Sequence, residues 1–273
     1  MAEVTAPARV ASRDGTRIAF WTTGTGPPLV LVHGTTSNHS TWHPLLPYLE
    51  PHATIHAMDR RGRGASDDGP VYDLAREFED VAAVVDAAAS ASGSPVDVLG
   101  HSFGGLCAFG AATLTPNVGR LVLYEGWPSP DPGAVADAPD VARRLDALLA
   151  AGDHEAVIAT FYREVVMMSD DELDEFRALP SWHDRVAAAH TIPREDAAVA
   201  AAPLDPEQAA TVTVPVLMLV GGDSPDTLAA DPGIVATALP DARIVVLEGQ
   251  QHIAHRLIPE AFAAHVVAFL RAG

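Results

Sequence analysis

The stretch VDVLGHSFGG occupies residues 96–105 and joins an apolar segment to a run of small residues. The apolar half is typical of a strand buried in a sheet, and the Ala- and Gly-rich residues up to Thr115 are typical of a closely packed helix that ends before Pro116. Between them, Gly100–Gly104 has the pattern G-x-S-x-G. In this pattern a tight strand-to-helix turn exposes the serine hydroxyl, and small neighbours let the backbones approach. This context predicts that Ser102 is a nucleophile.

Similar apolar runs alternate with amphipathic segments on both sides of this turn. Further strands are predicted at residues 28–34, 54–59, 120–125, 214–222 and 242–249, and helices are predicted to begin at Asp73 and Pro259. Residues 8–24 are expected to form a hairpin around the turn at Asp14-Gly15. Strand, helix, strand in this order predicts an α/β fold with a mostly parallel, doubly wound sheet covered on both faces.

The alternation stops between residues 126 and 208. This segment is Pro-rich at both edges and helical inside, and it carries six Arg against 17 acidic residues. We expect it to form an inserted helical cap, or lid. The α/β core is then made of residues 1–125 and 209–273.

The composition excludes several function classes. The 273 residues include 36 acidic and 17 basic side chains, for a formal charge of -19, and all 17 basic residues are Arg. Without Lys there is no P-loop lysine, Schiff-base lysine or Ser-Lys dyad. An isoelectric point near 4.8 argues against a nucleic-acid partner, which would need a basic surface.

The chain also gives no sign of a membrane or export segment. No apolar run approaches the roughly 18 residues of a membrane span, and the N-terminus lacks the features of a signal peptide. The single cysteine, Cys107, cannot form an internal disulfide. We therefore expect a cytoplasmic protein with no membrane partner, and the oligomeric state stays open between a monomer and a homodimer.

Taken together, these segments resemble the α/β-hydrolase fold superfamily over nearly the whole chain. The resemblance rests on LVHGTTS (31–37), DRRGRGAS (59–66), GHSFGG (100–105), LVLYE (121–125), PVLMLVGGDSP (215–225) and QQHIAH (250–255). It implies a lid-bearing hydrolase with a serine nucleophile, of the bacterial esterase or lactonase type. It also implies an oxyanion hole formed by the backbone N–H groups of Thr35 and Phe103. His33 is expected to buttress the loop that carries Thr35.

Twelve histidines are available as the base, and position selects His252. The order Ser, acid, His is that of α/β-hydrolases. In these proteins the base stands seven residues before a Pro-Glu pair, which here is Pro259-Glu260. His255 is the alternative. The His-x-x-His spacing does not establish a metal site because no Cys or carboxylate cluster accompanies it, so we expect no metal and no cofactor.

The acid departs from the commonest pattern of the superfamily. The usual G-x-x-D, counted from Gly221, places Ser224 where the Asp should stand, and Asp223 comes one position early. Glu125, however, directly ends the preceding predicted strand, a position that other branches of the superfamily use. A carboxylate there can reach the same imidazole nitrogen, fix its tautomer and stabilise the imidazolium. We favour Glu125 and keep Asp223 as the alternative.

These residues predict acyl transfer to water. Haloalkane dehalogenases and epoxide hydrolases have an Asp at the position of Ser102, so those activities are disfavoured. We expect hydrolysis of a small-molecule ester or lactone through an acyl-enzyme. The acidic cap favours a neutral, hydrophobic substrate. The candidate substrate contacts are Trp42, Trp182 and His183.

Other functions stay open at this point. The same Ser and His could catalyse C–C bond hydrolysis or a lyase or cyclase step. The fold can also serve as a non-catalytic receptor for a small molecule.

Overall fold

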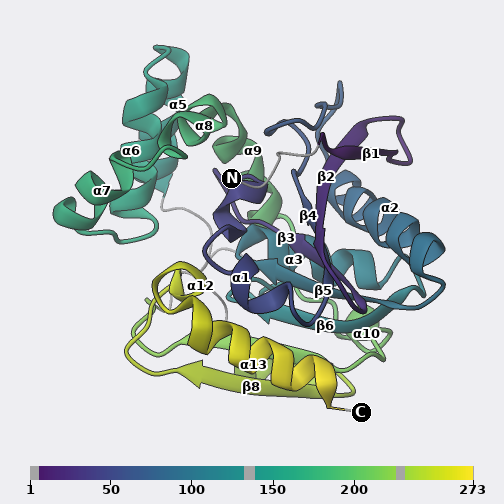
Figure 1. Ribbon diagram of the computed structural model, residues 1–273. Coiled ribbons are helices and arrows are strands. Elements are labelled where there is room, and N and C mark those ends of the chain that lie inside the picture. Colours follow the sequence, from purple (N-terminus) through teal and green to yellow (C-terminus); the bar gives the residue numbers. More distant parts are fainter. Residues whose placement is uncertain (1–5, 132–138, 226–230, 273) are drawn as a thin grey trace.

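The computed structural model describes residues 6–131, 139–225 and 231–272. Within these ranges one sheet has the strand order β1-β2-β4-β3-β5-β6-β7-β8 (Figure 1). The strands are β1 (Ala8–Ala11), β2 (Arg17–Gly24), β3 (Pro28–Val32), β4 (Thr54–Met58), β5 (Val96–His101), β6 (Val118–Tyr124), β7 (Val216–Gly221) and β8 (Ala242–Leu247). β2 runs antiparallel to both of its neighbours, and all pairs from β4 to β8 are parallel. The predicted mostly parallel α/β sheet is therefore confirmed.

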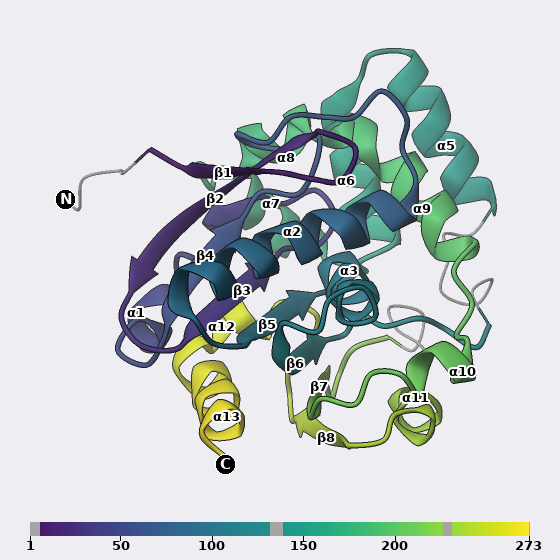
Figure 2. The same ribbon diagram turned by 90° about the vertical axis from the view of Figure 1, so that its right-hand side faces the viewer.

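Helices cover both faces of the sheet. They are η1 (His39–Trp42), α1 (Leu46–Leu49), α2 (Leu74–Ser92), α3 (Phe103–Ala112), α10 (Pro206–Ala209), α11 (Pro232–Ala238), α12 (Ala254–Leu257) and α13 (Pro259–Arg271). Along β3, Val30 and Val32 pack with α2 and α3, whereas Leu29 and Leu31 pack with α1 and α13. Figure 2 shows α13 and α3 on opposite sides of the sheet. Since successive side chains of a strand point to opposite faces, an uninterrupted apolar run is what a strand buried on both faces requires.

The remaining helices pack around a hydrophobic cluster of their own. They are α5 (Pro139–Ala150), α6 (His154–Glu164), α7 (Asp170–Arg177), α8 (Trp182–Ala187), η2 (Ala189–Thr191) and α9 (Ile192–Ala200). Their shared cluster includes Leu145, Ile158 and Leu173, and Figure 1 shows α5 to α8 grouped to one side of the sheet. Ala198 of α9 packs instead with the core under α2 and α3. The predicted division into a core (1–125 and 209–273) and a cap (126–208) stays a prediction, and we use the word cap for residues 139–208.

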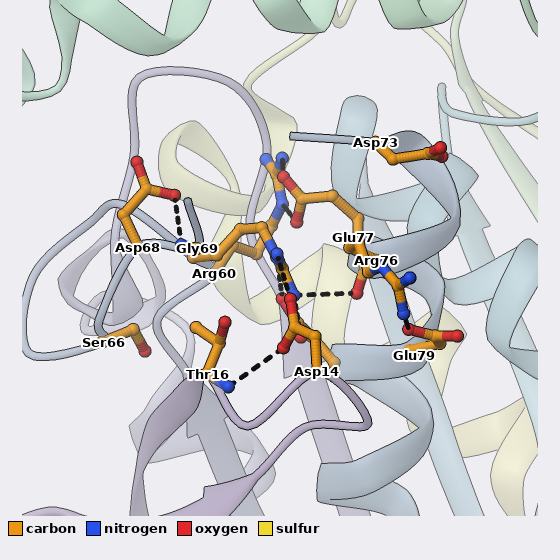
Figure 3. A network of polar contacts seen from close by, with 12 residues as sticks. Asp14, Thr16, Arg60, Ser66, Asp68, Gly69, Asp73, Arg76, Glu77 and Glu79 are labelled. Atoms are coloured by element: carbon orange, nitrogen blue, oxygen red, sulfur yellow. Dashed lines mark hydrogen bonds and ion pairs between the residues drawn. The ribbon is translucent and has the colours of Figure 1, made fainter. Parts of the chain in front are cut away.

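Buried ion pairs join this cap to the loop after β4. Arg60 is 0% exposed and donates two hydrogen bonds to the carboxylate of Glu77 on α2, of 2.7 and 3.1 Å (Figure 3). Its Nη2 also donates to Glu195 of α9 at 2.5 Å, and Arg63 pairs with the same carboxylate oxygen. The Nη1 of Arg60 lies 3.4 Å from the carbonyl oxygen of His33. One guanidinium thus contacts the loop after β3, helix α2 and the cap.

Among the described helices, none is both long and apolar enough to cross a membrane.

Replacing Glu195 with Gln should lower the free energy of unfolding by about 3–5 kcal/mol, because two buried guanidinium groups lose their shared anion. Burial raises the pKa of Glu195, but Arg60 and Arg63 outweigh it and hold the pKa below its ordinary value. The stabilisation is therefore present above the unfolded-state pKa of about 4.3 and is lost as the pH falls through the lower folded-state value. Urea denaturation of both proteins from neutral to acidic pH measures the difference.

Arg163→Gln is the matched control, because it breaks an exposed pair with Asp170 in which the two side chains are 45% and 79% exposed. We expect this change to cost less than about 1 kcal/mol. Equal losses in the two variants would contradict the structural role of the buried pairs.

Candidate active site

Ser102 lies at the turn between β5 and α3 with φ 54° and ψ -133°. A serine rarely adopts a positive φ, and such a conformation persists only where the surroundings hold it. Two glycines allow the close packing that does so. A Cβ on Gly104 would lie 2.4 Å from the carbonyl oxygens of Val32 and His33, and one on Gly126 would lie 1.8 Å from the carbonyl oxygen of Ser102. The predicted turn is present, and its small residues are needed for steric reasons.

His252, in the loop after β8, is joined to Glu125 at the end of β6. Its Nδ1 lies 2.7 Å from Oε2 of Glu125, and Oε1 of Glu125 accepts a 2.7 Å hydrogen bond from the N–H of Gly221. Burial raises the pKa of Glu125, but the hydrogen bond and charge of His252, together with the Gly221 N–H, bring the pKa below its ordinary value. An ionised carboxylate at Nδ1 leaves Nε2 as the basic nitrogen.

The alternative acid is placed elsewhere. Asp223 is exposed, and its backbone N–H donates to the carbonyl oxygen of Gln250 at 2.9 Å. Within the described ranges its carboxylate makes no hydrogen bond or ion pair with His252. The structure thus brings Glu125, and not Asp223, to the imidazole. The catalytic roles of Ser102, His252 and Glu125 stay predictions.

Two residues that sequence reasoning missed hold the loop of His252. The Nε2 of His101 donates to the carbonyl oxygen of His252 at 2.8 Å. The hydroxyl of Tyr124 donates to the carbonyl oxygen of Gln251 and accepts from the N–H of Ala254 at 2.9 Å. Both stand beside predicted residues, His101 before Ser102 and Tyr124 before Glu125. Each strand end therefore carries one predicted site residue and one side chain that positions the base loop.

The predicted oxyanion loop lies against the serine turn. A Cβ on Gly34 would lie 2.9 Å from the Cβ of Ser102, and Thr35, Ser102 and Phe103 line one pocket. In the described part of the chain, the N–H groups of Thr35 and Phe103 donate to no other residue. Both donors are thus available near Ser102, and their role as an oxyanion hole stays a prediction.

His33 has the buttressing position expected from the sequence. Its Nδ1 donates to the carbonyl oxygen of Gly34 at 2.9 Å, and its Nε2 accepts from the N–H of Arg60 at 3.1 Å. Burial and the nearby charges of Arg60 and Arg63 hold the pKa of His33 well below its ordinary value. The ring is therefore neutral and fixed in one tautomer.

The three predicted substrate contacts do not line the pocket of Ser102, which is a correction to the sequence analysis. Trp42 is fully buried in the core between the sheet, α1 and α13. Trp182 belongs to the hydrophobic cluster of the cap, and His183 is exposed. Packing inside the core and the cap accounts for both tryptophans.

Other residues of the cap line the pocket, and among them are the polar Tyr162 and the charged Arg185. The hydroxyl of Tyr162 lies 2.6 Å from Oγ1 of Thr36, and Arg185 donates to this hydroxyl at 2.6 Å. Arg256 of α12 is a further lining residue. No local pattern marked either arginine, because each lies on a short helix whose orientation depends on long-range packing. Among the described residues, no group of three or more His, Cys, Asp or Glu side chains is arranged to hold a metal ion.

Comparisons with known proteins agree with this geometry. A model of the alpha/beta hydrolase family matches residues 29–265. A pimeloyl-[acyl-carrier protein] methyl ester esterase of Aeromonas hydrophila is 30% identical over 90% of this chain and 96% of its own length. Lipase LipV of Mycobacterium tuberculosis is 35% identical, but the match covers only 47% of this chain and 46% of the lipase. The crystal structure of an alpha/beta hydrolase from Sphaerobacter thermophilus is 36% identical, with a TM-score of 0.82 over 96% of this chain and 100% of that one.

The contact between His252 and Glu125 can be tested by turnover of an activated ester. Glu125→Gln should lower kcat on the order of 10³- to 10⁴-fold, because an amide cannot stabilise the imidazolium and can select the wrong tautomer. Asp223→Asn is the control and should stay close to the wild-type rate. A near-normal Glu125→Gln enzyme would contradict the assignment of the acid.

Proposed function

Because the chain belongs to the alpha/beta hydrolase family, we propose that it is a serine hydrolase that cleaves a small-molecule ester or lactone through an acyl-enzyme on Ser102. The observation that carries the proposal is the 2.7 Å contact between His252 and an ionised, buried Glu125. Both line the same pocket as the strained Ser102. A receptor on this fold has no need of that arrangement, so it favours an enzyme over a binding protein.

The proposed mechanism gives each of these groups one role. Nε2 of His252 takes the proton of Ser102 as Oγ attacks the carbonyl carbon, and the N–H groups of Thr35 and Phe103 hold the oxyanion. The C–O bond then breaks, and His252 passes the proton to the departing alcohol oxygen. In the second half of the reaction, His252 takes a proton from water as the water oxygen adds to the carbonyl carbon of the acyl-enzyme. The bond to Ser102 then breaks, His252 returns the proton to Oγ, and the carboxylic acid is released. In a lactone the alcohol stays attached to the acyl group.

The relatives support an ester or a lactone as the substrate class. The relative from Aeromonas hydrophila is a methyl ester esterase and that from Mycobacterium tuberculosis is a lipase. A lactone presents the same carbonyl chemistry as an ester. Apolar side chains of the pocket, including Phe161, Val165 and Val166, favour a hydrophobic body on the substrate. C–C bond hydrolysis or a lyase or cyclase step would use the same Ser and His.

The expectation of an uncharged substrate rests on the total charge of the cap. Its densest acidic run, at Asp170, Asp171 and Glu172, forms the exposed first turn of α7. Acidic residues are favourable there because they face the positive end of the helix dipole. None of the three lines the pocket. The charge next to a bound substrate therefore depends on the residues that line the pocket, and the net charge of the cap does not determine it. A cytoplasmic location stays a prediction, and the oligomeric state stays open.

A fluorophosphonate probe and a panel of esters, lactones and thioesters test the proposed function. Wild type should take up one probe molecule, and Ser102→Ala should take up none. The variant should also lose hydrolysis of every responsive substrate, on the order of 10⁴-fold or more. Mass spectrometry and initial rates give the two readouts.

Ser37→Ala is the matched control, since Ser37 also lines the pocket but is no part of the proposed mechanism. It should label like wild type. An unlabelled, inactive wild-type protein would favour a receptor, and full activity in Ser102→Ala would overturn the mechanism.

A further inference from the structure

Two arginines without a carboxylate partner stand in the wall of the pocket that contains Ser102. They are Arg185 of α8 and Arg256 of α12. Among the described residues, no carboxylate oxygen lies within 4.0 Å of either guanidinium, although the protein has an excess of acidic side chains. Four other arginines of the cap each have such a partner: Arg144, Arg163, Arg177 and Arg194.

Arg185 is buried, with 5% of its surface exposed, and only some of its N–H groups have hydrogen-bond partners. Nη1 donates to the hydroxyl of Tyr162 at 2.6 Å and lies 3.4 Å from the carbonyl oxygen of Thr36. Nε is buried and has no hydrogen-bond partner in the described part of the chain. Neutral oxygens thus fix the position of this guanidinium, but they leave its charge uncompensated, which is costly for a buried cation.

Arg256 adds a second positive charge to the same place. It lies on the short helix α12 that follows the loop of His252 and is half-buried, and its guanidinium makes no hydrogen bond to another described residue. Its guanidinium carbon is 5.3 Å from the ring centroid of Phe176, and that of Arg185 is 4.5 Å from the same centroid. Burial and the charge of Arg185 lower the pKa of Arg256. The two like charges repel each other, and an anion between them would relieve that repulsion.

The acidic side chains of the pocket are engaged elsewhere. Glu125 is bonded to His252, and Glu195 pairs with Arg60 and Arg63. Asp196 also has an interaction partner. None of these three carboxylates lies within ion-pair distance of Arg185 or Arg256, so within the described ranges the protein offers the two guanidinium groups no compensating anion, and a ligand could supply one.

We propose that Arg185 and Arg256 bind a carboxylate that the substrate carries away from its scissile carbonyl. This inference rests on the proposed function and names its substrate class: an ester or lactone of a compound that also bears a free carboxylic acid. The planar fork of a guanidinium matches a carboxylate with two parallel hydrogen bonds. Both arginines are close to the proposed reacting groups. Arg185 contacts Thr36, next to the proposed oxyanion residue Thr35, and Arg256 lies four residues after His252. This proposal replaces the neutral substrate that the net charge of the cap led us to expect with one that carries a negative charge.

Matched substrates test the proposal directly. The neutral one is the para-nitrophenyl ester of hexanoic acid, and the anionic one is the mono-para-nitrophenyl ester of adipic acid, in which a carboxylate replaces the terminal methyl. A third ester carries a trimethylammonium group at that position. After subtraction of spontaneous hydrolysis, wild type should prefer the adipate ester to the hexanoate ester by about tenfold or more in kcat/KM. The cationic ester should be the poorest of the three.

Variants of Arg256 locate the preference. Arg256→Gln should reduce the ratio of the two kcat/KM values, adipate over hexanoate, by about tenfold, and Arg256→Glu should shift the preference toward the cationic ester. Arg163→Gln removes the same charge from an exposed part of the cap and should keep the wild-type ratio. Arg256 is the primary target because Arg185 also holds Tyr162 and Thr36, so its loss can disturb the fold.

The outcomes separate the two proposals. If wild type hydrolyses the hexanoate ester and Ser102→Ala does not, but no adipate preference exists or Arg256→Gln leaves the ratio unchanged, the carboxylate site is overturned and the proposed function stands. If Ser102 does not label and no ester is cleaved, the proposed function fails. Calorimetry with adipate and adipamide, on wild type and Arg256→Gln, then tests the arginines alone. Equal binding of the acid and the amide would overturn the site.

Discussion

The carboxylate of Glu195 lies between the buried guanidinium groups of Arg60 and Arg63, and the site depends on this contact. Arg60 also pairs with Glu77 and reaches the carbonyl oxygen of His33. Leaving any one of these charges unpaired inside the protein would cost several kcal/mol. Helix α9, helix α2 and the loop after β3 are therefore constrained to assemble together. Helix α9 of the cap, whose residues Ile192, Glu195 and Asp196 line the pocket of Ser102, is thereby tied through Arg60 to the loop after β3.

Charge acts differently at three scales in this molecule. The formal charge of -19 describes the whole chain, and the exposed acids of α7 are screened by solvent and salt. The buried pairs around Glu195 are locally balanced. Among the described residues, Arg185 and Arg256 bring to the pocket positive charge that no carboxylate pairs with, and this sign is opposite to that of the chain as a whole. A substrate that enters this pocket meets the local charge, because short-range interactions in a partly dry site outweigh screened surface charges.

Much of the fold and part of the candidate site can be predicted from local sequence. Apolar runs that end at Gly or Asp mark buried strands, and the G-x-S-x-G turn marks Ser102, because both signals lie within a few residues of chain. His252 could be chosen from its place after the last strand and its spacing to Pro259. The hairpin at Asp14-Gly15 was likewise predicted, since turn chemistry is local. The parallel pairing of the strands from β4 to β8 and the helices between residues 139 and 200 agree with these predictions.

Contacts between distant segments were decided only by the tertiary structure. The sequence placed Glu125 and Asp223 at the ends of neighbouring strands, where either carboxylate could reach the imidazole, and the path of the backbone brings only Glu125 to it. Trp182 looked like a substrate contact but packs inside the cap, whereas Arg185 and Arg256 face the pocket. The sequence by itself thus determined the mostly parallel sheet and the serine turn, and it singled out His252 as the predicted base. The orientation of the short helices, and with it the charge that a substrate meets, depends on long-range packing that no local pattern encodes.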